Sequence, residues 1–429
     1  MTSQPTKPKD NSVSIRLSLS LVFLIKFIIV NLKNLNVEEK RASISSKNMK
    51  LGIYVHVPFC STTCDFCSFY QEKPQKGQIH DYLEALELEF ELSPSCVDAT
   101  TVFFGGGTPS VLSAKDLERL IRIVKKRVGE NVSEWSIEMA PSSVKVDKLK
   151  VLKELGVNRI SLGVQSFDPV LLDFMGRQHS VSQLTQAYER IRDAGFTNVN
   201  LDLIFAFPGQ TESQWERDLK TAVALDPEHI STYCLIPEDA LSFFARIPKE
   251  KRKKASTEVE AKLFEITWDL LGKAGYQQYE IANYSKAGLE CQHNLNTWKM
   301  QEWLGFGPAA ASQFGGERYA NPANLQEWMN PLDEASLPHV NKERLSPREI
   351  FEDTLIFGLR MNEGVKKEYL QSFGGKVLVN SCLSFFKELV KQGVLLDEGQ
   401  AYRLTDKGRL LADSVAVDLM CVFDEAEFL

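Results

Sequence analysis

The feature of this sequence that most constrains its fold is a regular alternation of apolar, strand-like runs with amphipathic helical segments. The alternation repeats six times between residue 51 and about residue 275. It predicts an α/β fold with a parallel sheet, because parallel strands are joined by helical crossovers. The expected strands are residues 51–57, 100–104, 135–139, 159–164, 199–205 and 229–235, and the expected helices between them are residues 78–92, 113–128, 147–155, 182–194 and 212–225.

Six repeats suit a closed or partly closed (β/α)6 barrel, and a doubly wound open sheet is the alternative. In both architectures, ligands bind at the carboxyl ends of the parallel strands. The barrel is expected to occupy residues 49–285. Polar residues at these strand ends are therefore the first candidates for a functional site.

The last third of the chain predicts a second, smaller unit. Glycine and asparagine are frequent at residues 283–324, which indicates loops between domains, and residues 286–345 are expected to form a connecting region. Two helical segments, two short strand-like runs and a further helix then follow, at residues 346–360, 376–392, 394–396, 401–404 and from 405 onward. This order predicts a small helical, winged-helix-like domain over residues 346–429, a shape that does not by itself imply DNA binding.

The first 48 residues differ from the rest of the chain. Residues 17–32 are mostly apolar, but this stretch is shorter than the ~20 residues that span a bilayer. Lys26 lies near its middle, where a charge is costly. Met49 leads directly into the first strand, so we expect Met49 to be the natural start and residues 1–48 to be a misassigned or disordered extension. A weak membrane anchor is the alternative, and N-terminal sequencing of the native protein distinguishes the two.

Composition and charge exclude several classes of protein. The chain has 429 residues with 43% hydrophobic and 25% charged residues, as in globular proteins. Its net charge of -7 leaves no basic excess to neutralise phosphates, so a general nucleic-acid binder is not expected. Eight cysteines are too few for a disulfide scaffold, which favours a reducing, cytoplasmic location.

Three of the eight cysteines form one cluster directly after the first strand. Cys60, Cys64 and Cys67 have the spacing C-x3-C-x2-C. Thiolates are soft ligands that suit iron–sulfur clusters and zinc. Structural zinc sites need four ligands, and the sequence has no second cysteine pair of this kind. The spacing therefore favours three ligands of a four-iron cluster with one iron left open.

This cysteine loop resembles that of the radical S-adenosylmethionine superfamily. Four further runs are similar to its coproporphyrinogen-oxidase-like branch: YVHVPFC at 54–60, FFGGGTP at 103–109, SLGVQSF at 161–167 and DLI at 202–204. Two later runs, YEIANY at 279–284 and CQHNLN at 291–296, are similar to the HemW heme-chaperone family. The resemblance covers about residues 49–429. It implies a [4Fe-4S] cluster and S-adenosylmethionine, with heme as a further ligand.

The resemblance also implies roles for individual residues. Cys60, Cys64 and Cys67 would bind the cluster, and the remaining positions would contact S-adenosylmethionine or a second ligand. These positions are Tyr54 and Phe66 beside the cluster, the glycine-rich turn of Gly106, Gly107 and Thr108, and the polar residues Glu138, Gln165, Arg177 and Asp202 at or just past the strand ends. Glycine is needed at such a turn because only glycine lets backbone approach a ligand closely.

Two departures from the branch pattern bear on function. The oxidase has a fourth cysteine two residues after the third, and here that position is Phe69, which indicates a chain without oxidase activity. The chaperone motif His-Asn-x-x-Tyr-Trp has Thr297 in place of tyrosine. His293 in this motif is the candidate heme ligand, since neutral imidazole suits heme iron. A satisfied structural histidine is the alternative, and Trp298 and Trp303 could stack on the porphyrin or pack between domains.

Two functions of different classes remain open at this point. The first is a heme chaperone that passes heme to an acceptor protein, which the sequence does not identify. The second is a radical enzyme that acts on a porphyrinogen. Phe69 favours the chaperone. Contact with a membrane is expected only through recipient proteins or the N-terminal extension.

Overall fold

The computed structural model describes residues 50–62, 67, 69–177, 180–235, 257–373 and 375–426. Three of the predictions above concern residues outside these ranges: the extension of residues 1–48 followed by the expected start at Met49, the cluster ligand Cys64, and Phe66. Among the described helices, none combines the length and apolar character that crossing a bilayer requires.

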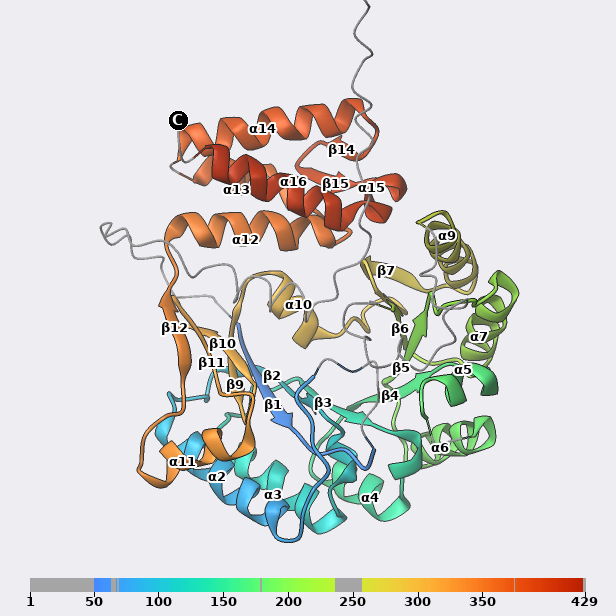
Figure 1. The fold of residues 1–429 in the computed structure, drawn as a ribbon, viewed down its shortest axis with the longest axis vertical. Helices are drawn as coiled ribbons and strands as arrows, with labels where there is room; N and C mark the ends of the chain where they lie inside the picture. The colour runs from blue at the N-terminus through green and yellow to red at the C-terminus, as the bar shows by residue number, and fades with distance from the viewer. Residues whose placement is uncertain are drawn as a thin grey trace, which may run out of the picture.

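Six parallel strands form the centre of the molecule and follow one another in chain order. They are β1 (Leu51–Val57), β2 (Ala99–Gly106), β3 (Glu134–Met139), β4 (Arg159–Gln165), β5 (Val199–Phe205) and β6 (His229–Cys234). The connecting helices are α2 (Gln78–Leu92), α3 (Ala114–Lys125), α4 (Val146–Glu154), α5 (Pro169–Phe174), α6 (Val181–Asp193) and α7 (Glu212–Ala224). They lie along the outer side of the curved sheet (Figure 1). The partial barrel is confirmed, because a doubly wound sheet would reverse its strand order at a switch point.

The two faces of this sheet have opposite character because side chains alternate along a strand. Outward-facing residues such as Val55, Phe104 and Leu201 are fully buried under the helices in the main hydrophobic core. Inward-facing residues are mostly polar. We call this set the inner face: Gly52, Tyr54 and His56 of β1, Thr101, Phe103 and Gly105 of β2, Glu134, Ser136 and Glu138 of β3, Arg159, Ser161 and Gln165 of β4, Asn200 and Asp202 of β5, and His229, Ser231 and Tyr233 of β6.

The expectation of loops at residues 283–324 is wrong. This region contributes β8 (Asn283–Ser285), α10 (Gln292–Trp298), β9 (Glu302–Phe306), β10 (Ala311–Phe314) and β11 (Glu317–Ala320). With β7 (Gln277–Glu280) and β12 (Val340–Arg344), these strands extend the sheet to twelve strands in the order β12-β11-β10-β9-β1-β2-β3-β4-β5-β6-β8-β7. Glycines here serve close backbone contacts: a Cβ on Gly305 would lie 2.3 Å from the carbonyl oxygen of Ala311. They mark tight strand packing, which sequence composition alone does not distinguish from a loop.

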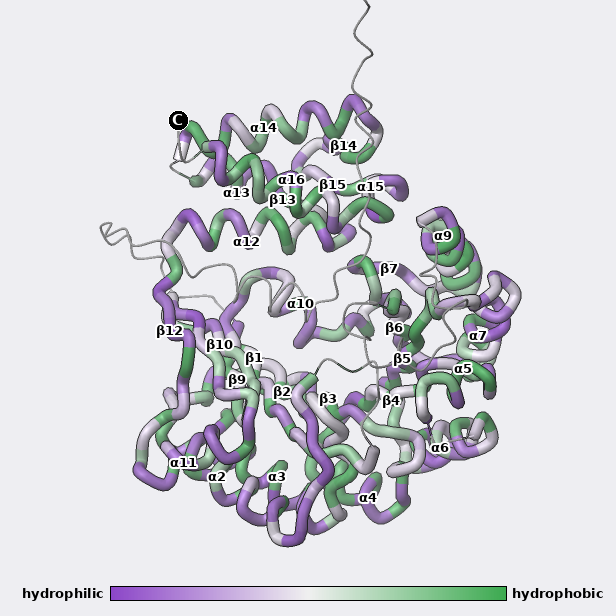
Figure 2. The backbone as a smooth tube through the Cα atoms, viewed as in Figure 1, coloured by the Kyte–Doolittle hydropathy of each residue, from purple (hydrophilic) through white to green (hydrophobic). Residues whose placement is uncertain are grey.

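The C-terminal helical domain forms its own core. Its elements are α12 (Pro347–Arg360), β13 (Val365–Lys366), α13 (Lys367–Ser372), α14 (Lys376–Lys391), β14 (Leu395–Glu398), β15 (Ala401–Leu404), α15 (Asp406–Leu410) and α16 (Ala412–Glu425). In Figure 2, α14 carries both apolar and polar stretches, as expected for a helix with one buried side. The helices and the β14–β15 ribbon match the expected winged-helix-like arrangement.

A buried ion pair joins the sheet to this domain. The Arg318 guanidinium of β11 donates to the Asp353 carboxylate of α12 at 2.7 Å and to the Gln313 amide oxygen at 2.5 Å. Arg318 and Asp353 are 5% and 8% exposed. Two buried charges therefore depend on each other where the domain meets the sheet.

Loss of one member of this pair is expected to destabilise the protein strongly. Asp353→Leu should lower the free energy of unfolding by about 3 kcal/mol, because it leaves the Arg318 charge buried without its partner. The double variant Arg318→Met/Asp353→Leu should recover most of this loss. Urea unfolding of the three proteins measures the effect, and equal stability of the single and double variants would contradict it.

Candidate functional site

The cysteine loop begins where β1 ends, at the carboxyl edge of the parallel strands. Its base is closed by two backbone hydrogen bonds, from Cys60 to Glu72 at 3.0 Å and from Glu72 to Pro58 at 2.8 Å. His56 also holds the end of the loop, since its Nε2 is 2.9 Å from the carbonyl oxygen of Tyr70. Both ends of the loop are thus held next to the end of β1. Cys64 itself lies outside the described residues.

The glycine-rich turn of Gly106, Gly107 and Thr108 packs against the start of the cysteine loop and hydrogen-bonds to it. The backbone N–H groups of Gly107 and Thr108 donate to the carbonyl oxygens of Val57 and Phe59, each at 2.8 Å. A Cβ on Gly107 would lie 2.8 Å from backbone atoms of Val57 and Pro58, and Gly106 has a positive φ of 104° beside the His56 ring. The close approach that glycine permits is therefore made to the backbone of the cysteine loop. The predicted contact of this turn with S-adenosylmethionine stays a prediction.

The two described cysteines of the loop fit the expected cluster. Cys60 is buried, with its Sγ 3.3 Å from the Thr108 hydroxyl, and Cys67 is partly exposed. Burial, Glu138 and Cys67, in that order, raise the pKa of Tyr54, so the Cys67 sulfur lies within electrostatic reach of the predicted cofactor contact Tyr54. Within the described ranges no three His, Cys, Asp or Glu side chains form a metal-binding group, and those ranges omit Cys64. Soft donors at a strand end are the donor set that iron–sulfur clusters use.

Two carboxylates of the inner face, Glu138 and Asp202, lie within electrostatic reach of each other. Burial raises the pKa of Glu138 to about 8, with repulsion from Asp202 adding to it and the Gly106 N–H and Arg159 opposing it. Burial also raises the pKa of Asp202, against hydrogen bonds from Ser161 and the charge of Arg159. Asp202 lies in the middle of β5 rather than at its end, which corrects the expectation for this residue. The pair is suited to a cationic group, because a positive charge between the carboxylates would relieve their repulsion.

The raised pKa of Glu138 predicts a pH-dependent stability. Its value of about 8 lies above the usual 4.5, so the folded state disfavours the ionised form. This penalty is absent below pH 4.5, grows as pH rises, and is complete above pH 8. Relative to Glu138→Gln, the metal-free wild-type protein should lose about 4 kcal/mol of stability between pH 5 and pH 9.

Urea unfolding of both proteins at pH 5, 7 and 9 measures this difference. Glu91→Gln, on the exposed side of α2, controls for the general loss of one carboxylate. A wild-type-minus-variant difference that does not change with pH would show that Glu138 ionises normally in the folded protein.

Gln165 lies at the end of β4, as expected, whereas Arg177 is separated from that strand end by α5. Gln165 is the last residue of β4 and has a positive φ of 68°. Arg177 follows α5, and its backbone N–H donates to the carbonyl oxygen of Leu172 at 2.9 Å. The predicted contacts of both residues with a cofactor stay predictions.

The structure places His293 at the opposite, amino-terminal end of the strands. Helix α10 closes this end, and the Glu134 carboxylate accepts from the backbone N–H groups of Gln292 at 2.9 Å and His293 at 3.1 Å. The His293 Nδ1 is 3.0 Å from the Thr101 hydroxyl. Its ring centroid lies 5.2 Å from Phe103 and 6.4 Å from Tyr54. His293 is thus separated from the cysteine loop by the Tyr54–Phe103 layer.

Three histidines lie on or against the inner face, and they differ in how many of their ring nitrogens have a hydrogen-bond partner. His56 uses both nitrogens, toward the Tyr54 hydroxyl and the Tyr70 carbonyl, and His229 uses both, toward Asn200 and Tyr279. For His293, only Nδ1 has a hydrogen-bond partner among the described residues. The residue is 7% exposed, and its Nε2 has no hydrogen-bond partner among the described residues. Burial lowers the pKa of His293 to about 3, which keeps the imidazole neutral.

The two tryptophans considered as porphyrin contacts pack elsewhere. Trp298 belongs to the C-terminal core, with its ring 5.6 Å from Phe357 and under the Arg360 guanidinium. Trp303 is 9% exposed and donates to the carbonyl oxygen of Ala311. The packing alternative holds for both. Phe69, by contrast, is 42% exposed beside the cysteine loop.

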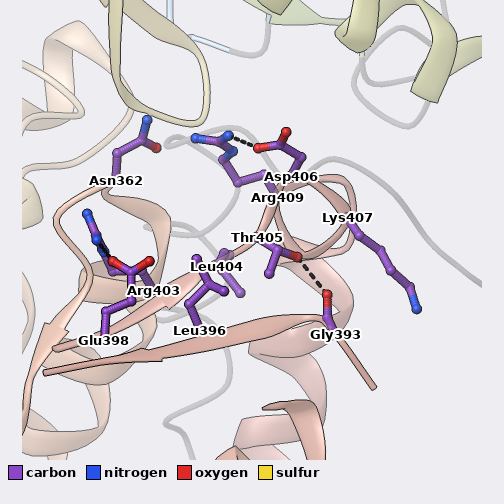
Figure 3. Close-up of a pocket in the computed structure, with 10 residues that line it drawn as sticks. All are labelled: Asn362, Gly393, Leu396, Glu398, Arg403, Leu404, Thr405, Asp406, Lys407 and Arg409. Atoms are coloured by element: carbon purple, nitrogen blue, oxygen red, sulfur yellow. Dashed lines mark hydrogen bonds and ion pairs between the residues drawn. The ribbon is translucent and has the colours of Figure 1, made fainter. Parts of the chain in front are cut away.

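A cavity of about 620 Å³ lies away from this site, beside the β14–β15 ribbon (Figure 3). Asn362 borders it and donates to the carbonyl oxygen of Gln278 in β7. The ion pairs Arg403–Glu398 and Arg409–Asp406 lie within its wall, so these charges already neutralise each other. It therefore adds no ligand group to the site on the inner face.

Sequence reasoning missed several inner-face residues that the structure brings together. Thr101, Glu134 and Arg159 are all buried under α10, and His229 and Tyr279 are linked at 2.8 Å. The available signal was polar residues alternating with apolar ones along strands of a parallel sheet. Such strands are usually apolar on both faces.

Comparisons with known proteins agree with this architecture. The sequence profile of the Radical SAM superfamily matches residues 54–222, and that of the HemN C-terminal domain matches residues 345–411. The chain is 35% identical over 367 residues to the heme chaperone HemW of Bacillus subtilis, covering 84% of this chain and 97% of the relative. It is 32% identical to HemW of Mycobacterium tuberculosis, over 86% of this chain and 94% of that protein.

A solved structure resembles the whole fold. Coproporphyrinogen III oxidase (HemN) from Escherichia coli, a radical SAM enzyme, matches with a TM-score of 0.76 at 23% identity, over 86% of this chain and 90% of that chain. At this level of identity the likeness supports the fold alone. The identity of 35% to HemW of Bacillus subtilis, over 97% of that relative, gives the assignment: this chain belongs to the HemW family of the radical SAM superfamily.

Proposed function

We propose that this protein is a heme chaperone. In this proposal, Cys60, Cys64 and Cys67 hold a [4Fe-4S] cluster at the carboxyl end of the strands, and His293 binds heme iron from the inner face. The relatives named heme chaperones support this function, and the missing fourth cysteine at Phe69 supports it over a porphyrinogen oxidase.

The observation that carries the heme assignment is the open Nε2 of His293. A neutral imidazole nitrogen without a hydrogen-bond partner in the described part of the chain is available as a metal ligand. The other two inner-face histidines lack such a nitrogen, since both of their nitrogens are hydrogen-bonded. His293 is therefore the ligand that the inner face offers to iron.

The protein's own residues also suit the second cofactor. When bound, the cluster supplies an iron with an open position for the amino and carboxylate groups of S-adenosylmethionine. Glu138 and Asp202 would attract the cationic part of that molecule, and Tyr54 would lie beside it. The Gly106–Thr108 turn would hold the cysteine loop in place during binding.

We further propose that heme passes to an acceptor protein and that the chaperone works in the cytoplasm. Cys96, Cys291 and Cys382 are buried and free, which suits a reducing compartment. The acceptor is a heme protein in its heme-free form.

The test uses full-length protein whose cluster is reconstituted without oxygen. Hemin should bind saturably and then move to a heme-free acceptor such as apomyoglobin, followed by the change in its visible spectrum. The same preparation, given coproporphyrinogen and S-adenosylmethionine, should form no decarboxylated product. Turnover of coproporphyrinogen without saturable hemin binding would identify the protein as a radical enzyme instead.

A further inference from the structure

We propose that Thr101 is a positioning residue that orients the His293 ring for iron binding and hydrogen-bonds its Nδ1 in either neutral tautomer. The proposal rests on the function proposed above and deepens it. In this proposal, the Thr101 hydroxyl of β2 hydrogen-bonds the ring nitrogen of His293 that does not bind iron.

In the described part of the chain, Thr101 is the one hydrogen-bond partner of the His293 ring. The Thr101 Oγ1 is 3.0 Å from Nδ1, and the two residues are 1% and 7% exposed. Gly52 makes room for this arrangement, because a Cβ there would lie 3.3 Å from the ring. Glu134 fixes the backbone of His293 by accepting its N–H at 3.1 Å. The backbone of His293 is thus held by a residue of β3, and its ring by a residue of β2.

A hydroxyl at this position suits both neutral forms of the imidazole. When the single ring proton is on Nε2, the Thr101 hydroxyl donates to Nδ1. Iron needs the lone pair of Nε2, so the ring proton must then lie on Nδ1, and the same hydroxyl accepts it. The imidazole keeps one proton throughout, so the exchange of tautomers releases none.

His229 shows the contrasting arrangement. Its Nδ1 lies 2.6 Å from the Asn200 side-chain oxygen, an acceptor, and its Nε2 lies 2.8 Å from the Tyr279 hydroxyl. An amide oxygen only accepts, so the ring proton of His229 is held on Nδ1, and a protein group occupies the other nitrogen. Thr101 instead allows either tautomer of His293, whose Nε2 has no hydrogen-bond partner among the described residues.

The test compares Thr101→Val, which keeps the shape but removes the hydroxyl, with Thr101→Ser, which keeps the hydroxyl. In the heme-free protein, side-chain ¹⁵N NMR of the six histidines reports the tautomer, with the His293 signals assigned by their loss in His293→Ala. Thr101→Val should shift the His293 signals, and Thr101→Ser should leave the tautomer as in the wild type. This arm does not depend on heme binding.

In the heme-loaded protein, Thr101→Val should weaken hemin binding about 10-fold and shift the heme reduction potential, whereas Thr101→Ser should stay within about 2-fold of the wild type. Thr232→Val replaces a buried threonine of β6 and controls for the loss of a strand hydroxyl. Unchanged His293 signals in Thr101→Val would overturn the proposal, as would unchanged affinity and potential. If the wild type fails to bind hemin, the proposed function fails, and the NMR arm still decides the role of Thr101.

Discussion

Cys64→Ala should remove the iron–sulfur cluster entirely. Iron content of the protein purified without oxygen is expected to fall from about four atoms per chain to near zero, together with the broad visible absorbance of the cluster. The reason is that three thiolates on one loop hold three corners of the cluster, and two cannot retain it. Elemental analysis and absorbance measure the result.

The matched control is Cys421→Ala. Cys421 is a free, exposed cysteine of α16 in the C-terminal domain, so its loss should leave iron content unchanged. Equal iron in Cys64→Ala and the wild type would contradict the ligand assignment. Zinc in place of iron in the wild-type protein would exclude an iron–sulfur cluster at this site.

His293→Ala is expected to have the second large effect, the loss of saturable hemin binding. Affinity should fall at least about 100-fold, or about 2.7 kcal/mol, because no other inner-face histidine offers an open nitrogen. Iron and sulfide content of the cluster should be unchanged, because His293 lies at the opposite end of the strands from the cysteine loop. Hemin titration of the reconstituted protein measures the affinity.

The control for this variant is His80→Ala. His80 is exposed on α2, where its ring contacts Arg119 and Glu84. Its replacement should leave hemin affinity within about 2-fold of the wild type. Thermal unfolding of His293→Ala checks that loss of the Thr101 contact has not released α10. A stable His293→Ala protein that binds hemin as the wild type does would exclude His293 as the ligand.

Much of the barrel could be predicted from the sequence because its strands and helices carry local signals. β1, α2 and β5 match the expected ranges without any shift. Helix starts were also readable: the Ser113 side chain accepts from the backbone N–H of Asp116, as a capping residue does. The strands between residues 283 and 324 were missed because each is only three to five residues long and is paired through distant contacts. β9, for example, is held by its parallel pairing with β1, some 250 residues away.

The functional site, like the fold, could be predicted only in part from the sequence. The cysteine spacing, the glycine-rich turn and Phe69 were readable directly, because each motif lies on one loop. Asp202 was expected at a strand end and lies within β5, within electrostatic reach of Glu138. The burial of Trp298 could not be predicted from the sequence either, since it depends on α12 packing over α10.

The sequence by itself determined the alternation of strands and helices, the cysteine spacing at the first strand end and the absence of a fourth cysteine there. These features depend on residues close together in the chain, where spacing and periodicity fix the outcome. The tertiary structure alone decided that α10 closes the amino end of the inner face, and that the Thr101 hydroxyl contacts one ring nitrogen of His293 while the other has no partner among the described residues. Those facts depend on hydrogen bonds between residues about 190 positions apart, which only the folded chain brings within 3 Å.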